Sequence, residues 1–170
     1  MAITFERADT IDDATFDILF STSLDDIKSG TLNYPNDLTT DDEIKTWARE
    51  HFNFESNTRH GILVKKDNTP INWIVGNNNP SDTFVWNVVL NGTINGSKAV
   101  FYTSEWHTNH KAYQQSIGVS KYRIPCIKDS RVDNYFTQAQ ADGVMLGTYT
   151  RNAVTYDGTE TGQIQHCWEF

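Results

Sequence analysis

The sequence has few cysteines, no long hydrophobic run and no signal-like N-terminus. Its two cysteines, Cys126 and Cys167, lack the CxxC spacing of zinc and redox motifs. We expect two reduced, buried thiols, or a disulfide if the strands that carry them are neighbours. No apolar run is long enough to span a membrane, and residues 1–10 lack the basic and apolar regions of a signal peptide. We therefore expect a cytoplasmic protein with no membrane partner.

Positive charge is also scarce, since the chain has 14 lysines and arginines against 22 aspartates and glutamates. The formal net charge of −8 repels phosphate backbones, so nucleic acid is not an expected partner. An acidic surface also keeps a protein soluble without any specific partner. The five Trp, nine Phe and seven Tyr provide enough apolar volume for a core, and the length predicts a single domain over residues 1–170.

The first half of the chain predicts a strand, two helices and an antiparallel meander. Residues 3–7 alternate as a strand does, and residues 14–28 carry an apolar stripe at helical spacing that ends before Gly30. Thr40 and Glu43 form a capping box, which predicts that a second helix begins there. The meander follows, with strands over 61–65, 70–76, 83–90 and 98–102. Its turns are predicted at Asp67-Asn68-Thr69, Asn91-Gly92 and Asn95-Gly96.

The second half predicts two helices, each followed by strand structure. Residues 104–117 have apolar positions at helical spacing, and Gly118 stops that helix. Pro125, within a strand predicted over 122–127, indicates an edge, a bulge or a split in the pairing. The remaining elements are a helix from Ser130 to Gly143 and strands over 144–149 and 164–170. The order β-α-α-β-β-β-α-β-α-β-β, with a further hairpin strand, predicts an α/β (α+β) fold whose mixed, largely antiparallel sheet has helices on both sides.

The junction between the strand over 98–102 and the helix over 104–117 is the strongest candidate site. A strand that enters a helix through a short polar turn presents N–H groups and a positive dipole end, which suit an anion. Glu105 at the helix start could act as a general base toward an amine, or His107 could relay the proton. The alternative is a helix start that tolerates an acid, with one exposed and one half-buried imidazole.

Other residues with chemical potential have structural explanations as well. His107 and His110 share a helical face, but the sequence places no third ligand, so no metal site is expected. Cys126 as a nucleophile needs an adjacent base, and we expect it in the core. Arg131 could bind an anion, but an ordinary surface arginine explains it equally well. Three tryptophans could line a pocket, although such residues are usually core: Trp73, Trp86 and Trp106.

The element order resembles that of the GNAT N-acetyltransferase superfamily over essentially the whole chain. The resemblance is carried by ITFERAD before an acidic helix start, by the hairpin GILVKKDNTPINWIVG, and by the step from the last helix through Gly143-Val144 into a strand. In this family the strands before and after the third helix hold the pantetheine arm of acetyl-CoA, and the N-terminus of that helix receives the pyrophosphate. The resemblance therefore implies these cofactor-binding residues: Tyr102, Thr103, Ser104, Trp106 and Asn109.

The resemblance also implies an acetyl-CoA-dependent N-acyltransferase, in which a small-molecule or peptide amine attacks the thioester directly. Tyr135, one turn upstream of the family's position at Ala139, would replace the tyrosine that acts as general acid on the thiolate. The family's pyrophosphate loop reads Gln/Arg-x-x-Gly-x-Gly/Ala, whereas residues 103–110 contain neither glycine nor arginine. The alternative is therefore a catalytically inactive GNAT-fold module for binding or assembly, which has lost the CoA site and forms a stable homo-oligomer or partner complex.

Overall fold

The structure is a computed structural model of the chain, and it describes residues 2–21, 34–35, 37–82, 85–94, 103–141, 143, 146–154 and 157–170. The elements in chain order are β1 (Ile3–Arg7), α1 (Asp13–Ser21), α3 (Asp41–Phe52), β2 (Arg59–Lys66), β3 (Thr69–Asn78), β4 (Trp86–Thr93), α4 (Ser104–Ser116), β5 (Tyr122–Ile127), α5 (Arg131–Ala141), β6 (Gly147–Val154) and β7 (Glu160–Glu169). The predicted strand over 98–102, the turn at Asn95-Gly96 and the distal part of the helix over 14–28 lie outside the described residues.

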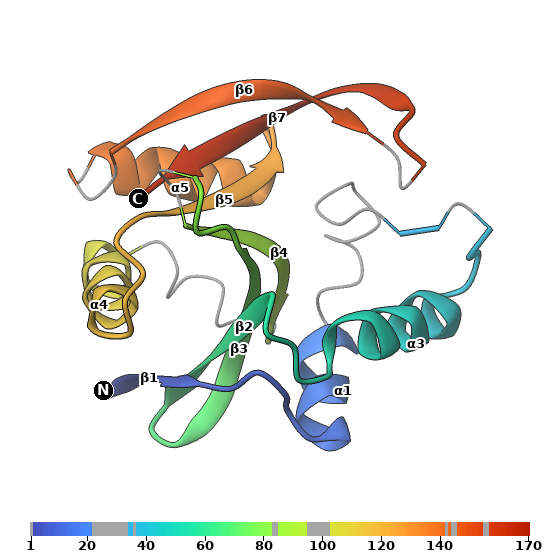
Figure 1. Cartoon of the computed structure of the whole chain (residues 1–170), viewed down its shortest axis with the longest axis horizontal. Helices are drawn as coiled ribbons and strands as arrows, with labels where there is room; N and C mark the ends of the chain where they lie inside the picture. The colour runs from blue at the N-terminus through green and yellow to red at the C-terminus, as the bar shows by residue number, and fades with distance from the viewer. Residues whose placement is uncertain are drawn as a thin grey trace.

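Seven strands form one sheet in the order β1-β2-β3-β4-β5-β7-β6. Neighbouring strands are antiparallel except β4 and β5, which are parallel. Parallel neighbours need a crossover connection, and α4 lies in the connection from β4 to β5. Helices α1 and α3 lie on one side of the sheet, while α4 and α5 lie on the other (Figure 1). The predicted fold class, a mixed and largely antiparallel sheet between helices, is confirmed.

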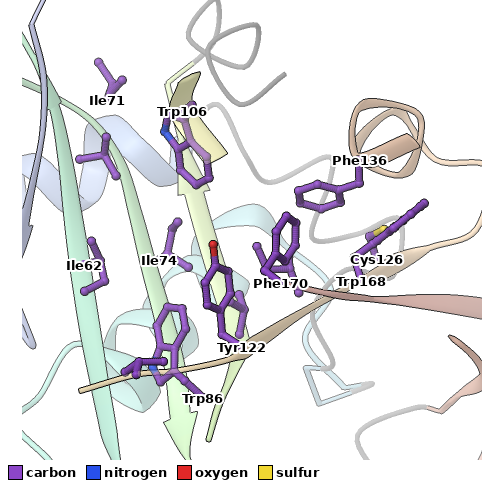
Figure 2. Close-up of a cluster of buried hydrophobic side chains, with 14 residues drawn as sticks. Ile62, Ile71, Ile74, Trp86, Trp106, Tyr122, Cys126, Phe136, Trp168 and Phe170 are labelled. Carbon is purple, nitrogen blue, oxygen red and sulfur yellow. The ribbon is translucent and has the colours of Figure 1, made fainter. Parts of the chain in front are cut away.

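Two hydrophobic clusters occupy the two faces of the sheet. The α4-side cluster includes Ile62, Ile74, Trp86, Trp106, Tyr122, Phe136 and Phe170 (Figure 2). The α1-side cluster includes Phe16, Leu19 and Phe20 of α1, Ile44, Ala48 and Phe52 of α3, and Trp73 of β3. The three tryptophans that could have lined a pocket are therefore core residues. Among the described helices, none is both long and apolar enough to cross a membrane.

Helix α3 begins where the capping box predicts. The Glu43 amide donates to the Thr40 hydroxyl at 3.2 Å, and the Thr40 amide donates to a Glu43 carboxylate oxygen at 2.9 Å. This reciprocal pair satisfies two N–H groups that the first turn of a helix leaves without intrahelical partners. The buried side of α3 then packs on the sheet through Ile44, Ala48 and Phe52.

The prediction of a turn at Asn91-Gly92 is wrong, because β4 continues through Thr93. Asn91 lies opposite Ile74 and Gly92 lies opposite Trp73 in the ladder with β3. Gly92 serves a close approach rather than a turn, since a Cβ atom there would lie 2.7 Å from the ring of Phe20. The predicted strand over 83–90 is correspondingly shifted to Trp86–Thr93.

The last hairpin is also longer than predicted. β6 spans Gly147–Val154 rather than 144–149, and β7 spans Glu160–Glu169 rather than 164–170. Most side chains of β6 are exposed on both faces, so hydrophobic alternation gives no signal for the strand. Pairing with β7 decides its length instead, and part of the stretch expected to be a connection belongs to that ladder.

Candidate functional site

Strands β4 and β5 pair at one end only and then separate. Trp86 lies opposite Tyr122 and Asn87 lies opposite Arg123, and both strands continue beyond these pairs. Within the described residues, the ladder between the two strands ends there. We call this feature the β4–β5 divergence. It consists of β4 from Val88 onward and of β5 from Ile124 onward.

Pro125 explains why the ladder ends where it does. Tyr122 and Phe170 exchange two backbone hydrogen bonds, at 3.3 and 3.0 Å, between β5 and the end of the chain. Hydrogen bonding alternates residue by residue in an antiparallel pair, so the backbone nitrogen of Pro125 faces β4 rather than β7. Proline has no N–H, so β5 lacks the next donor that it could offer to β4 beyond Arg123. Pro125 was predicted to mark an edge, a bulge or a split in the pairing, and the structure shows the split.

A β-bulge in β4 lies at the same level. Val75 pairs with Leu90 while Gly76 pairs with Val88, so Val89 is an extra residue in β4. A bulge bends its strand and reverses the direction of the side chains that follow. Val88 accordingly belongs to the α4-side cluster, whereas Leu90 belongs to the α1-side cluster. The bulge and the proline act together, because one bends β4 and the other removes the donor of β5.

Beyond the bulge, the edge of β4 that faces β5 carries ordered polar backbone. The Ile94 amide donates to the Ile71 carbonyl at 3.0 Å. This bond establishes which residues of β4 direct their backbone groups toward β3 and which direct them away from it. Gly92 then directs its backbone groups toward β3, whereas Asn91 and Thr93 direct theirs toward the β4–β5 divergence. An extended chain that carries amide groups could pair with this edge as an added strand does.

A buried amide lies beside this edge. The Asn72 Nδ2 donates to the Asn91 Oδ1 at 2.6 Å, to the Gly92 carbonyl at 2.8 Å and to the Thr93 hydroxyl at 3.3 Å. Asn72 is fully buried, and its Oδ1 has no hydrogen-bond partner among the described residues. Sequence reasoning missed this group. The available signal was an asparagine within the apolar run from Ile71 to Val75, since buried amides normally have partners.

The N-terminus of α4 is capped by a side chain of its own. The Trp106 amide donates to the Thr103 hydroxyl at 3.2 Å. Glu105 and Asn109 are exposed, whereas Trp106 is buried in the α4-side cluster with its ring centroid 5.7 Å from that of Phe5. Trp106 therefore points away from the helix start that it was predicted to serve. Two predicted positions lie beyond what the structure describes: Tyr102 and the side chain of Ser104.

The expectation of one exposed and one half-buried imidazole on α4 is wrong, because His107 and His110 are both fully buried. The His107 ring stacks on Phe170, with centroids 5.1 Å apart and planes within 8°. The His110 Nδ1 lies 3.0 Å from the Tyr122 hydroxyl. Burial lowers the pKa of His110 to about 3, so its ring is neutral at pH 7. Since Glu105 is exposed and His107 is buried, α4 directs the two predicted catalytic side chains to different sides.

Tyr135, the third predicted catalytic residue, is half-buried on α5. Its neighbour Asp133 is the centre of a cluster that the sequence did not reveal. The Asp133 Oδ1 accepts from His166 Nδ1 and from Trp168 Nε1, each at 2.8 Å, and the Asp133 Oδ2 accepts from the Asp129 amide at 2.8 Å. Burial favours the neutral acid, but these hydrogen bonds outweigh it and lower the pKa of Asp133.

The two cysteines are buried and free, as predicted. Their strands are neighbours, but Cys126 lies opposite His166 and Cys167 lies opposite Pro125. An offset of one residue places the two thiols on opposite faces of the sheet, which excludes a bridge between them. Burial raises the pKa of Cys126, so this thiol is a poor nucleophile.

Within the described part of the chain, no group of three or more His, Cys, Asp or Glu side chains could hold a metal ion.

The sheet order, the crossover through α4 and the divergence of β4 from β5 define the GNAT acetyltransferase fold. A protein from Desulfovibrio desulfuricans, described as an acetyltransferase of the GNAT family, superposes with a TM-score of 0.56 at 10% identity, over 99% of this chain and 98% of its own. No protein-family model and no curated protein sequence matches the chain. At such low identity, the likeness is one of fold.

Two further solved structures have names that state a substrate. The ribosomal-protein-S18-alanine N-acetyltransferase from Escherichia coli superposes with a TM-score of 0.55 at 8% identity, over 99% of this chain and 93% of its own. A spermidine N-acetyltransferase chimera from Vibrio cholerae and hSSAT superposes with a TM-score of 0.57 at 9% identity, over 99% of this chain and 94% of its own. The shared fold therefore spans nearly the full length of each protein.

Proposed function

We propose that this protein is an N-acyltransferase that uses acetyl-CoA and transfers the acetyl group to a small-molecule or peptide amine. The β4–β5 divergence carries the proposal, because it leaves the β4 edge at Asn91 and Thr93 facing a side that β5 does not cover. The names of the similar structures support an amine acceptor, since one of those enzymes is named for spermidine and another for a protein alanine.

The residues at the divergence fit the pantetheine arm of the cofactor. The arm is an extended chain with two amide groups, and the N–H and C=O groups of Asn91 and Thr93 suit such a chain. The start of α4 fits a diphosphate less well, because the Thr103 hydroxyl already accepts from Trp106 and Glu105 adds negative charge nearby. The connection from β4 to α4 over residues 95–102 lies outside the described residues.

Acetyl-CoA, when bound, would supply a thioester that a neutral amine can attack. In the proposal, backbone N–H groups of β4 stabilise the negative charge that develops on the carbonyl oxygen. Glu105 is exposed at the start of α4 and takes the proton from the incoming ammonium group. Tyr135 returns a proton to the departing thiolate.

Calorimetric titration with acetyl-CoA and with CoA, together with release of the free thiol in the presence of spermidine or an alanine-terminated peptide, tests the proposal. We expect binding, and we expect Glu105→Gln to lower kcat by about 100-fold without weakening the binding of acetyl-CoA. The matched control is Glu50→Gln, which changes an exposed glutamate on α3 and should leave both unchanged. Absence of heat and of any thermal shift at millimolar acetyl-CoA would overturn the proposal.

The same titration addresses the alternative of an inactive binding or assembly module. The observation that favours this alternative is the commitment of Trp106 and His107 to the core, which leaves few side chains at the start of α4 for a cofactor. A protein that ignores CoA and acetyl-CoA but forms a stable complex would support the module. Turnover of acetyl-CoA would exclude it.

A further inference from the structure

Strand β6 forms one edge of the sheet, and its exposure is unusual for an ordinary edge. Among the described residues β6 pairs with β7 alone, and Figure 1 shows it as the outermost ribbon beyond β7. Its five consecutive residues 148–152 are all exposed, so both faces of the strand contact solvent. The β7 residues opposite them, 164–168, are mostly buried, so the exposure is a property of the edge strand and not of its partner.

This edge lacks the features that prevent one strand from pairing with another. Protein edges usually carry lysine, proline, a bulge or inward charges. Residues 147–154 contain no lysine and no proline, and Arg151 is their only charged residue. The irregularity of the hairpin lies in β7, where Gly162 has a φ of 80°, so β6 stays regular. The chain has 22 acidic residues, but none lies between Asp142 and Asp157. β6 itself therefore adds no negative charge to the repulsion between two acidic molecules.

The ladder on the other side of β7 reveals which backbone groups of β6 point outward. Tyr122 and Phe170 exchange backbone hydrogen bonds, so alternate residues of β7 from Phe170 backward face β5. The β7 residues between them, Glu169, Cys167 and Gln165, direct their backbone groups to β6. Their partners there are Gly147, Tyr149 and Arg151. Three residues of β6 therefore direct their N–H and C=O groups to the open edge: Thr148, Thr150 and Asn152.

We propose that two copies of this chain pair through β6, antiparallel and around a two-fold axis at Thr150. Thr150 then lies opposite Thr150 of the second copy, and Thr148 lies opposite Asn152 of the second copy. All three outward-facing residues find partners, and three residue pairs with two bonds each give six backbone hydrogen bonds. The seven strands of each copy join into one continuous sheet.

The side chains favour this register over its neighbours. Tyr149 lies opposite Arg151 of the second copy in a non-hydrogen-bonded pair, where side chains approach closely and a cation can contact an aromatic face. Moving the register by one residue in each copy would place Arg151 opposite Arg151, and like charges directly opposite each other destabilise a sheet.

Sedimentation from about 1 µM to about 500 µM, the range expected for a small interface, tests the proposal on the full chain. We expect a dimer for the unmodified protein and for Thr150→Val, which keeps the N–H and the β-branched shape. Thr150→Pro should be monomeric, because it removes only an N–H that faces outward and leaves the ladder with β7 intact. Its circular dichroism and melting temperature at low concentration report whether it folds.

A charge swap keeps the test decisive if the proline variant does not fold. Thr150→Asp and Thr150→Lys each place like charges on the two-fold axis, so each should dimerise about tenfold or more weakly. An equimolar mixture of the two should form a heterodimer. The matched controls are Thr46→Asp and Thr46→Lys on the exposed side of α3, which should dimerise like the unmodified protein. A monomer at all concentrations, or a dimer that ignores every change at Thr150, would overturn the proposal.

Discussion

The Nδ1 atom of His110 lies 3.0 Å from the hydroxyl oxygen of Tyr122, and both side chains are almost completely removed from solvent. On the other side of the ring, the Gln114 Nε2 lies 3.2 Å from the His110 Nε2. The contact joins α4 to β5 at Tyr122, in the short paired stretch that precedes the β4–β5 divergence. The buried polar side chains of α4 therefore hold this helix against the sheet next to the candidate site.

Tyr122→Phe should destabilise the protein, because it leaves the His110 Nδ1 buried without a hydrogen-bond partner. We expect a loss of about 1–3 kcal/mol in the free energy of unfolding, measured by urea denaturation. The control Tyr149→Phe removes a hydroxyl from a partly exposed tyrosine and should change this free energy by less than about 0.5 kcal/mol. Equal effects of the two substitutions would contradict the structural role of the His110–Tyr122 contact.

The protein should lose stability between pH 7 and pH 5. Burial, together with smaller contributions from the nearby His107 and His60, lowers the pKa of His110 in the folded protein to about 3. The unfolded chain therefore binds a proton near pH 6.5 that the folded chain does not bind. Stability is present above that pH and declines as the pH falls toward 3, and His110 alone contributes a loss of about 2 kcal/mol between pH 7 and pH 5.

Urea denaturation at several pH values measures this dependence. Burial also lowers the pKa of His60, which acts in the same direction. The shifted carboxylates Asp12, Asp17, Glu43 and Asp133 have pKa values below their ordinary ones, so their effects fall below this pH window. His110→Gln should flatten the curve between pH 7 and pH 5. An unchanged slope in that variant would contradict the assignment.

Asp133→Asn should be far more costly than removal of an exposed acid. The new amide would turn an N–H toward the Asp129 N–H or toward the His166 and Trp168 donors, so at least one buried donor would lose its acceptor. We expect a loss of about 2–3 kcal/mol in unfolding free energy. Asp13→Asn, at a carboxylate whose side chain is 78% exposed, is the matched control and should cost less than about 0.5 kcal/mol.

Gly92→Ala tests the close approach between β4 and α1. The added Cβ would lie 2.7 Å from the ring of Phe20, which is fully buried, so the ring or the strand would have to shift within the core. We expect a loss of about 1–3 kcal/mol in unfolding free energy. Gly147→Ala, also in a strand but with nothing within 4 Å of the added atom, should be neutral within about 0.5 kcal/mol. A neutral Gly92→Ala would mean that Asn91-Gly92 is not packed against α1.

The sequence by itself determined the elements whose signals are local. The capping box at Thr40 and Glu43 operates within one helical turn, so it located the start of α3 without knowledge of the rest of the chain. The turn at Asp67 and Asn68 is equally local, and both residues adopt the positive φ angles, 49° and 66°, that such a hairpin requires. The order of these elements was sufficient to predict the fold class.

The candidate site was determined only in part. Pro125 indicated a break in pairing because the missing N–H is a property of the residue itself. Which strand would lose that donor depends on the hydrogen-bonding phase with β7, which the structure fixes through Tyr122 and Phe170. The burial of His107 likewise depends on Phe170, the last residue of the chain, which stacks on it across more than sixty positions of sequence.

Only the tertiary structure decided the features that join distant segments. Asp133 meets His166 and Trp168 because α5 packs across β7, and no spacing in the sequence encodes that meeting. Asn91-Gly92 has the composition of a turn, but pairing with β3 and contact with Phe20 keep it in a strand. Local patterns report the conformations that a segment prefers, whereas the free energy of long-range pairing and burial selects among them.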